Sequence, residues 1–360
     1  MKKHTRLWML VAMLTSGLMV ACNGGTSTKA PTSKKTHDPI TLQVTGTNKY
    51  EPHNFVDGKC TMCDETTDFI QDPLNKANPT YLTEACEEQG KVEAITYTYH
   101  KKDGTTMDKT AYVYTPYGYN AEDKNTKYDV MYMLHGKGLN EGYWFAQGTY
   151  KSTDGIYTGG FGTQNMIDRL MKEGKAKKAI YVTPTYYMDA QETQDEGNFG
   201  EELTKDLMPY IAEHYNTFAL DSTEASLKAN RDHQAYVGLS LGSMYSYQII
   251  LANYVDYFSY VGSFSGSSVG EESWNAIADG LSTGKFKDTK LKYWYAGVGS
   301  LEDGNTYPGD PFNAFRIIVS KVDYLKQGEN CMFMLTNKTG HNYATWITCL
   351  YNCIQKFFKA

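Results

Sequence analysis

The chain has 360 residues, of which 41% are hydrophobic, and a formal net charge of −6 at neutral pH. This length suits one large domain with a substantial core and a small additional segment. The mild acidity, with no basic patch in the sequence, argues against a nucleic-acid partner. The 30 tyrosines combine a flat apolar face with a polar tip, which suits either the binding of sugars and phenols or packing in strands and on surfaces.

The N-terminus has the pattern of an export signal over residues 1–21. A positively charged start precedes an apolar run over residues 7–19, which is too short to span a membrane and remain there. Residues 18–22 read Leu-Met-Val-Ala-Cys and resemble the lipobox of bacterial lipoproteins, although the methionine departs from the usual leucine. The resemblance implies lipidation of Cys22 and a membrane anchor in the cell envelope, on the periplasmic or outer face of the outer membrane. An ordinary signal peptide is the alternative. Residues 22–40 are polar and are expected to form a flexible tether.

A small module is expected over residues 41–80. Its Cys60 and Cys63 form a Cys-x-x-Cys on a glycine turn, which is a common half of a structural zinc site. With His53 the module supplies three ligands, and Cys86 is a distant candidate for the fourth. The alternatives are a local disulfide or two reduced thiols, since the chain is expected to be exported.

Residues 81–360 alternate between predicted strands and helices, which indicates an α/β fold with a mostly parallel central sheet flanked by helices. Strands are predicted over 92–99, 110–114, 128–134, 179–184, 234–237, 260–266, 291–298 and 331–335. Helices are predicted over 166–174, 199–215, 245–251 and 345–358. The segment 271–290 has no clear period and is a candidate lid over the site.

A Gly-x-Ser-x-Gly motif centred on Ser240 stands between a predicted strand and a predicted helix. In this context the motif predicts the nucleophile elbow of an α/β-hydrolase. The tight turn projects the serine hydroxyl, and Gly238 and Gly242 leave room for neighbouring backbone. The alternative is an ordinary turn, because glycine and serine are common turn residues.

The remaining catalytic candidates follow from chain order, which in α/β-hydrolases is serine, acid, histidine. His341 is the single histidine after Ser240, and it lies just past the last predicted strand. The acid should follow the strand over 291–298, where Glu302 and Asp303 compete and Asp310 is a more distant option. Residue type alone does not decide between them.

The oxyanion hole is expected to use two backbone amides. The first is that of Leu241, at the start of the helix after the serine. The second is expected near Lys137 or Gly138, in the loop after the strand over 128–134. His135 begins this loop, and we expect it to brace the loop by hydrogen bonds instead of acting as the base.

Several short motifs carry a resemblance to a known family. They are Leu134-His135-Gly136-Lys137-Gly138 with Glu141 and Trp144, the serine motif over 238–242, Ser263-Phe264-Ser265-Gly266, and Gly340-His341 with Trp346. The segment from about Cys86 to the C-terminus resembles carbohydrate esterase family 1, the feruloyl and acetylxylan esterases related to esterase D. Members often carry Gly-Thr-x-Asp shortly before Tyr-Pro. Anchoring on Tyr307-Pro308 favours Asp303 as the acid, although one extra residue intervenes here.

The resemblance implies an α/β-hydrolase fold and a secreted serine carboxylesterase. It would remove feruloyl or acetyl groups from plant cell-wall polysaccharide or oligosaccharide, such as xylan, through a triad of Ser240, His341 and Asp303 and without a cofactor. A feruloyl group needs an aromatic pocket. The candidates for lining it are Trp144, Phe145, Tyr186, Tyr343 and Trp346, and core packing is the alternative role of each. The rival functions are a thioesterase, peptidase or acyltransferase on the same scaffold, and a non-catalytic glycan-binding surface lipoprotein.

Overall fold

The computed structural model describes residues 55–56, 59–60, 70–145, 162–188, 198–302 and 310–359. The predicted export signal, the lipidation site Cys22, the tether, and the candidate zinc ligands His53 and Cys63 lie outside these residues. Within the predicted module, the strands β1 (Phe55–Val56) and β2 (Lys59–Cys60) pair in antiparallel orientation. None of the described helices is long and apolar enough to cross a membrane.

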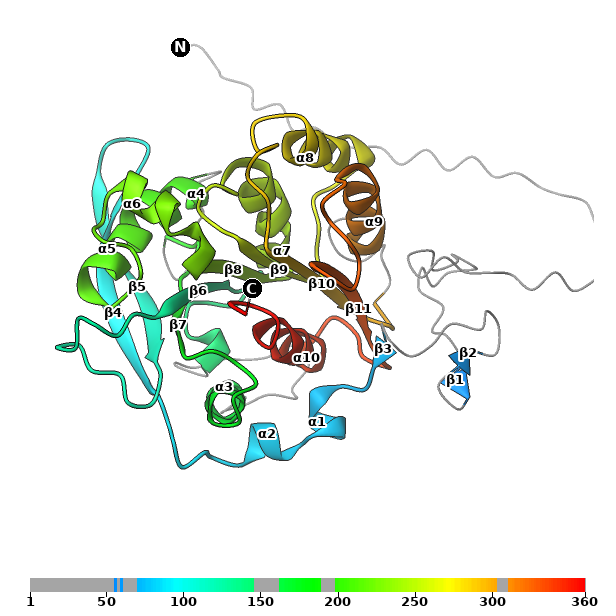
Figure 1. The fold of residues 1–360 in the computed structure, drawn as a ribbon, viewed down its shortest axis with the longest axis horizontal. Helices are drawn as coiled ribbons and strands as arrows, with labels where there is room; N and C mark the ends of the chain where they lie inside the picture. The colour runs from blue at the N-terminus through cyan, green and yellow to red at the C-terminus, as the bar shows by residue number, and fades with distance from the viewer. Residues whose placement is uncertain are drawn as a thin grey trace, which may run out of the picture. The chain divides into compact units, whose positions relative to one another are not determined.

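A nine-stranded sheet forms the centre of the domain, in the order β3-β11-β10-β9-β8-β6-β7-β5-β4 (Figure 1). Strand β5 runs antiparallel to both neighbours, and every other pair in the sheet is parallel. The prediction of a mostly parallel sheet is therefore confirmed. The strands are β3 (Ile70–Gln71), β4 (Lys91–His100), β5 (Thr106–Thr115), β6 (Asp129–Leu134), β7 (Ala179–Thr183), β8 (Gln234–Leu239), β9 (Tyr260–Phe264), β10 (Tyr293–Gly299) and β11 (Cys331–Thr336).

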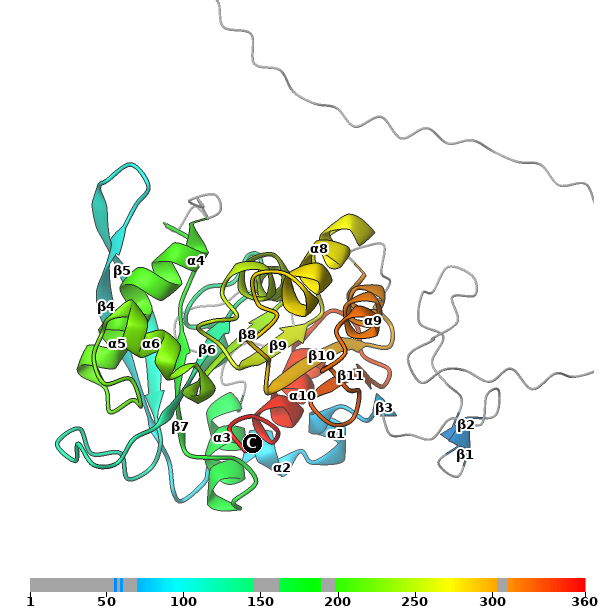
Figure 2. The same ribbon diagram turned by 45° about the horizontal axis from the view of Figure 1, so that its top comes forward.

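Helices cover both faces of this sheet (Figures 1 and 2). One face carries α1 (Leu74–Ala77), α2 (Thr80–Thr83), α3 (Thr163–Lys172) and α10 (Tyr343–Ile354). The other carries α4 (Phe199–Glu201), the π-helical turns η3 (Glu202–Leu207) and η5 (Ser246–Leu251), α5 (Met208–His214), α6 (Glu224–Ala229), α7 (Leu241–Tyr245), α8 (Glu271–Ser282) and α9 (Pro311–Lys321). The short helices η2 (Tyr143–Phe145) and η4 (Arg231–His233) lie in loops. Residues 271–282 of the segment considered as a lid form α8, which packs against α9.

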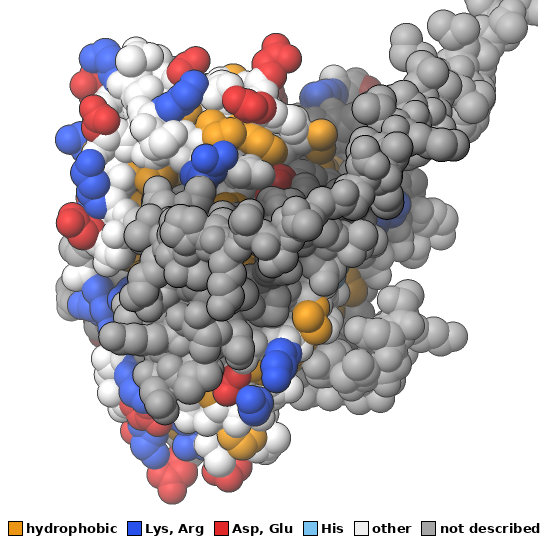
Figure 3. Space-filling model, turned by 90° about the vertical axis from the view of Figure 1, so that its right-hand side faces the viewer, with side chains coloured by type: hydrophobic (Ala, Val, Ile, Leu, Met, Phe, Trp, Pro, Cys, Tyr) orange, Lys and Arg blue, Asp and Glu red, His pale blue; other side chains and the backbone are white. Residues whose placement is uncertain are grey.

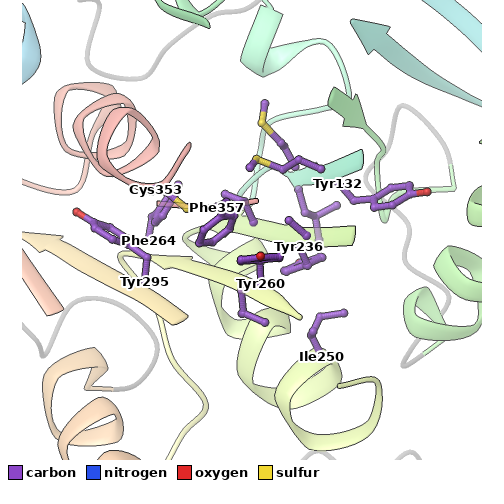
Figure 4. Packing of buried hydrophobic residues seen from close by; sticks show 14 of the residues in the cluster. Tyr132, Tyr236, Ile250, Tyr260, Phe264, Tyr295, Cys353 and Phe357 are labelled. Atoms are coloured by element: carbon purple, nitrogen blue, oxygen red, sulfur yellow. The ribbon is translucent and has the colours of Figure 1, made fainter. Parts of the chain in front are cut away.

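The core lies between the sheet and its two helical layers. Strands β7, β8, β9 and β10 are buried along their whole length, as expected of parallel strands covered on both faces. Tyrosines supply much of this core, because Tyr132, Tyr236, Tyr260 and Tyr295 are almost fully buried among aliphatic and aromatic neighbours (Figure 4). Packing in strands therefore accounts for many of the tyrosines.

The surface carries charges of both signs. On the face shown in Figure 3, acidic and basic side chains of the described residues are interspersed. Among the described residues, some charged side chains are paired one helical turn apart, such as Lys205 with Glu201 at 2.9 Å. Exposed pairs of this kind contribute only about 0–1 kcal/mol each, so the stability of the fold resides in the core.

Residues 70–80 belong to the main sheet and its helical layer. Strand β3 pairs in parallel with β11, and the buried Leu74 donates its backbone N–H to Thr348 Oγ1 of α10 at 2.9 Å. From the sequence, these residues are expected in the module over 41–80. A two-residue strand gives no periodic signal, so the sequence could not reveal that this segment joins the sheet.

The parallel arrangement decides where functional side chains meet. Strands β6, β8, β10 and β11 run in the same direction, so the loops that follow them emerge at one edge of the sheet. These loops carry His135, Ser240, Glu302 and His341. Crevices outside the carboxyl ends of parallel strands are the usual ligand sites of open α/β sheets.

Close backbone contact at Gly238 gives the first prediction. A Cβ atom there would lie 2.1 Å from the carbonyl oxygen of Gly242. Gly238→Ala should therefore lower the free energy of unfolding by at least about 1–3 kcal/mol, measured by urea denaturation. Gly280→Ala in α8 is the control, because a Cβ there meets nothing within 4 Å. It should raise stability by about 0.5–1 kcal/mol. Equal stability of Gly238→Ala and wild type would contradict the close approach.

Candidate active site

Ser240 occupies a strained turn between β8 and α7. Its φ of 52° and ψ of −115° are rare for a residue with a side chain, and such strain persists only where the surroundings enforce it. Its N–H donates to the carbonyl of Phe264 at 2.8 Å, and its own carbonyl accepts from the N–H of Met244 at 3.0 Å. Its side chain is thereby directed out of the sheet towards the histidine loop.

His341 bridges Ser240 and Glu302. Its Nε2 lies 2.9 Å from Ser240 Oγ, and its Nδ1 lies 2.9 Å from Glu302 Oε2. An ionised carboxylate can only accept, so Nδ1 carries the proton and Nε2 accepts from the serine hydroxyl. A nucleophile, a base and an orienting acid need this geometry for acyl transfer.

The carboxylate of Glu302 is held in place on its other side. Its Oε1 accepts from the Gly299 N–H at 2.7 Å and from the Ser265 hydroxyl at 2.6 Å. One oxygen is thus fixed by two donors while the other faces His341. Ser265 has a φ of 59°, and the sequence predicts no role for its hydroxyl.

The acid candidates therefore separate. Glu302, the alternative acid predicted from the sequence, is hydrogen-bonded to His341. Asp303, the preferred acid, lies outside the described residues. Asp310 caps α9, where its side chain accepts from the Asn313 N–H at 3.2 Å.

The loops that carry Glu302 and His341 are tied together by hydrogen bonds from their backbone N–H groups. The Leu301 N–H donates to the Thr339 carbonyl at 2.9 Å, and the Lys338 N–H donates to Ser300 Oγ at 2.8 Å. Gly299 lets them approach, since a Cβ there would lie 2.3 Å from the Thr339 carbonyl oxygen. The acid and the base are therefore positioned by their loops as well as by their own contact.

The candidate oxyanion amides lie on either side of the serine. Leu241 is the first residue of α7, where backbone N–H groups have no acceptor within the helix. On the other side, Gly136 approaches so closely that a Cβ would lie 2.9 Å from Ser240 Cβ. The Gly138 N–H already donates to the hydroxyl of Tyr187 at 2.9 Å. The geometry thus favours Lys137, which follows Gly136, over Gly138 as the second amide.

His135 braces this loop as a neutral side chain. It is buried, with Nδ1 2.7 Å from the Gly136 carbonyl oxygen and Nε2 2.7 Å from Thr185 Oγ1. The carbonyl can only accept, so Nδ1 donates to it and Nε2 accepts from the Thr185 hydroxyl. Burial lowers the pKa of His135 to about 3, which excludes a charged ring at neutral pH. The expected bracing role is confirmed by these contacts.

The five aromatic candidates are all buried, and two of them contact site histidines. The ring of Trp346 meets His341 edge-on with centroids 5.2 Å apart, and Tyr186 stacks on His135 at 4.6 Å. The buried indole N–H groups of Trp144 and Trp346 have no hydrogen-bond partner among the described residues. The full set is Trp144, Phe145, Tyr186, Tyr343 and Trp346.

Within the described ranges, no cluster of three or more His, Cys, Asp or Glu side chains could hold a metal ion. Cys86, the distant zinc-ligand candidate, is a buried free thiol. The proposal of a structural zinc on His53, Cys60 and Cys63 concerns side chains outside the described part of the chain.

The low pKa of His135 makes stability depend on pH. The unfolded chain binds a proton at this residue near pH 6.5 and the folded chain only near pH 3, so stability falls as the pH drops through this window. His135→Asn should flatten the plot of unfolding free energy against pH there, by up to about 1.4 kcal/mol per pH unit. Urea denaturation of both proteins between pH 4 and pH 7 measures the two slopes. Equal slopes would mean that folded His135 binds its proton over the same pH range as the unfolded chain, against a lowered pKa.

Relatives share both the sequence and the fold. Residues 104–354 match the family described as "Putative esterase". Endo-1,4-beta-xylanase Y of Acetivibrio thermocellus is 28% identical over 62% of this chain and 19% of that protein. Endo-1,4-beta-xylanase/feruloyl esterase of Xylanibacter ruminicola is 27% identical over 75% of this chain and 32% of that protein. The chain thus spans a third or less of the length of these curated relatives.

Solved structures of similar fold include the feruloyl esterase module from Clostridium thermocellum, as a mutant complexed with sinapinate. It matches with a TM-score of 0.62 and 23% identity, over 81% of this chain and 95% of that one. A ferulic acid esterase from the anaerobic fungus Anaeromyces mucronatus matches with a TM-score of 0.57 and 22% identity, over 78% and 95%. Because the family match covers well over half of the chain, the protein belongs to this esterase family and has the α/β-hydrolase fold.

Proposed function

We propose that the protein is a serine carboxylesterase that removes feruloyl groups from plant cell-wall polysaccharide such as xylan. The observation that carries the proposal is the hydrogen-bonded chain from Ser240 through His341 to Glu302. Family membership supports the reaction class. The names of the two curated relatives support xylan as the polysaccharide, and one of them also names a feruloyl esterase.

The mechanism is a two-step acyl transfer. Ser240 Oγ attacks the ester carbonyl while His341 Nε2 takes its proton, and Glu302 stabilises the imidazolium that forms. The amides of Leu241 and Lys137 donate to the oxyanion, each worth about 3–4 kcal/mol of barrier. The sugar hydroxyl leaves with the proton from His341. Water then attacks the acyl-enzyme by the same route and releases the acid.

The acyl group is proposed to be aromatic because of the residues around the base. Trp346 lies edge-on against the base His341, and Tyr186 stacks on His135, which begins the loop whose Gly136 approaches Ser240. A planar phenolic acid gains more from such neighbours than an acetyl group does. Acetyl esters of xylan are the second candidate, which the substrate comparison tests.

Substrate preference and the nucleophile are tested together. Wild-type protein should hydrolyse methyl ferulate with a higher kcat/KM than the acetyl esters of acetylated xylan. Ser240→Ala should lose several orders of magnitude in turnover, because nucleophile, base and acid act as a unit. A preference for acetylated xylan would overturn the feruloyl assignment. Absence of any ester hydrolysis, together with no labelling by a fluorophosphonate, would favour the non-catalytic binding protein.

The acid is tested by a matched pair of amide substitutions. Glu302→Gln should lower kcat on methyl ferulate by about 10³–10⁴-fold, because an amide next to Nδ1 favours the wrong histidine tautomer. Asp303→Asn, one residue away, should leave kcat within a few-fold of wild type. The reverse ranking would return the role to Asp303, and two active variants would mean that neither residue is the acid.

A further inference from the structure

A buried ion pair lies beside the site without contacting the reacting groups. Lys109 Nζ, from β5, lies 2.6 Å from Glu202 Oε1, from η3, and the two side chains are 2% and 4% exposed. Taking both charges out of water costs several kcal/mol per ion, so a buried pair is weak support for stability. The presence of this ion pair therefore needs an explanation other than stability.

The pair also holds the segment that follows β7. Lys109 Nζ donates to the backbone carbonyl of Thr185 at 2.7 Å. The Thr185 hydroxyl accepts from the Tyr187 N–H at 3.1 Å and donates to His135 Nε2 at 2.7 Å. Thr185 is therefore fixed by the ion pair through its backbone and fixes His135 through its side chain.

His135 in turn fixes the peptide unit that joins Gly136 and Lys137. Its Nδ1 donates to the carbonyl of Gly136 at 2.7 Å. In a trans peptide, this carbonyl and the N–H of Lys137 lie in one plane and point in opposite directions. Holding the carbonyl towards His135 therefore directs the Lys137 N–H away from it. Gly136 lies against Ser240, so this N–H belongs to the peptide unit beside the nucleophile.

The remaining contacts of the pair make it rigid. The Tyr97 hydroxyl donates to Glu202 Oε1, and Lys109 Nζ lies over the Tyr99 ring, 5.1 Å from its centroid. A buried polar network with its members paired in this way specifies a single arrangement.

We infer that the Lys109–Glu202 ion pair positions the oxyanion hole, through Thr185 and His135, by fixing the direction of the Lys137 N–H. Lys109 and Glu202 are positioning residues, because neither contacts the reacting atoms. The inference rests on the proposed function, since it assigns the Lys137 amide to the oxyanion. If the ion pair is removed, stabilisation of the transition state should be lost while substrate binding is kept.

The test is the double variant Lys109→Met/Glu202→Gln, which leaves no single buried charge. With methyl ferulate, kcat should fall by about 10–100-fold, less than the loss of a whole oxyanion donor, while KM stays within about twofold. Affinity for an aryl boronic acid, whose serine adduct is tetrahedral, should fall by the same factor as kcat.

Two substitutions at Thr185 probe the middle of the path with the ion pair intact. Thr185→Val removes the hydroxyl and should lower kcat and boronic acid affinity together, whereas Thr185→Ser should restore both. If the double variant does not fold, this pair decides the question. Gln234→Met is the matched control, because the Gln234 side chain is buried and donates to the Leu227 carbonyl at 2.6 Å, at the start of β8, the opposite end from Ser240. It should lose stability and keep kcat.

The outcomes separate this inference from the proposed function. Wild-type kcat and boronic acid affinity in a folded double variant, or in Thr185→Val, would overturn the inference and leave the esterase activity standing. A parallel fall in kcat in Gln234→Met would also overturn it, because general destabilisation would then explain the effect. Wild-type protein without esterase activity would overturn the proposed function, and the inference with it.

Discussion

The common direction of the central strands is the constraint on which the site depends. Loops after β6, β8, β10 and β11 emerge at one edge of the sheet only because these strands are parallel. Ser240 and His341 are 101 residues apart in sequence and still lie within hydrogen-bond distance. Long crossovers through helices on both faces make this possible, and they bury the strands between two layers.

At this edge of the sheet, backbone hydrogen bonds position the turn of Ser240 and the loops of Glu302 and His341. The strained turn at Ser240 is held by bonds from Phe264 and Met244, and the loops of Glu302 and His341 are bonded to each other. Side-chain hydrogen bonds then hold the carboxylate of Glu302 and the loop that begins at His135. A preorganised site of this kind needs little rearrangement as charge develops on the substrate.

The sequence was sufficient for features that depend on chain order and periodicity. The parallel sheet follows from alternating apolar strands and helices, and Ser240 and His341 follow from a motif and from histidine's scarcity. Residue type could not decide the acid, and the family resemblance favoured Asp303. Neighbouring residues in an irregular loop point in different directions, so only tertiary contacts show that Glu302 faces His341. The engagement of the Gly138 amide by Tyr187 is equally a matter of tertiary contact.

The Lys109–Glu202 pair could not be predicted from the sequence, for a different reason. Lysine and glutamate are almost always exposed, so a pattern of residue types assigns both to the surface. The pairing of β3 and the packing of the segment over 70–80 could not be predicted, because a strand of two residues shows no periodic pattern. The sequence thus identifies the residues that chemistry requires more readily than the residues that hold them in place.

The tyrosine-rich core has a spectroscopic consequence. Burial raises the pKa of Tyr132, Tyr236 and Tyr295 well above that of a free phenol, so these rings keep their protons in the folded chain. The unfolded chain ionises them near pH 10, and the folded state therefore loses stability as the pH rises beyond that value. In alkaline solution, the ultraviolet absorbance of phenolate from these residues reports the opening of the core and not the titration of an intact protein.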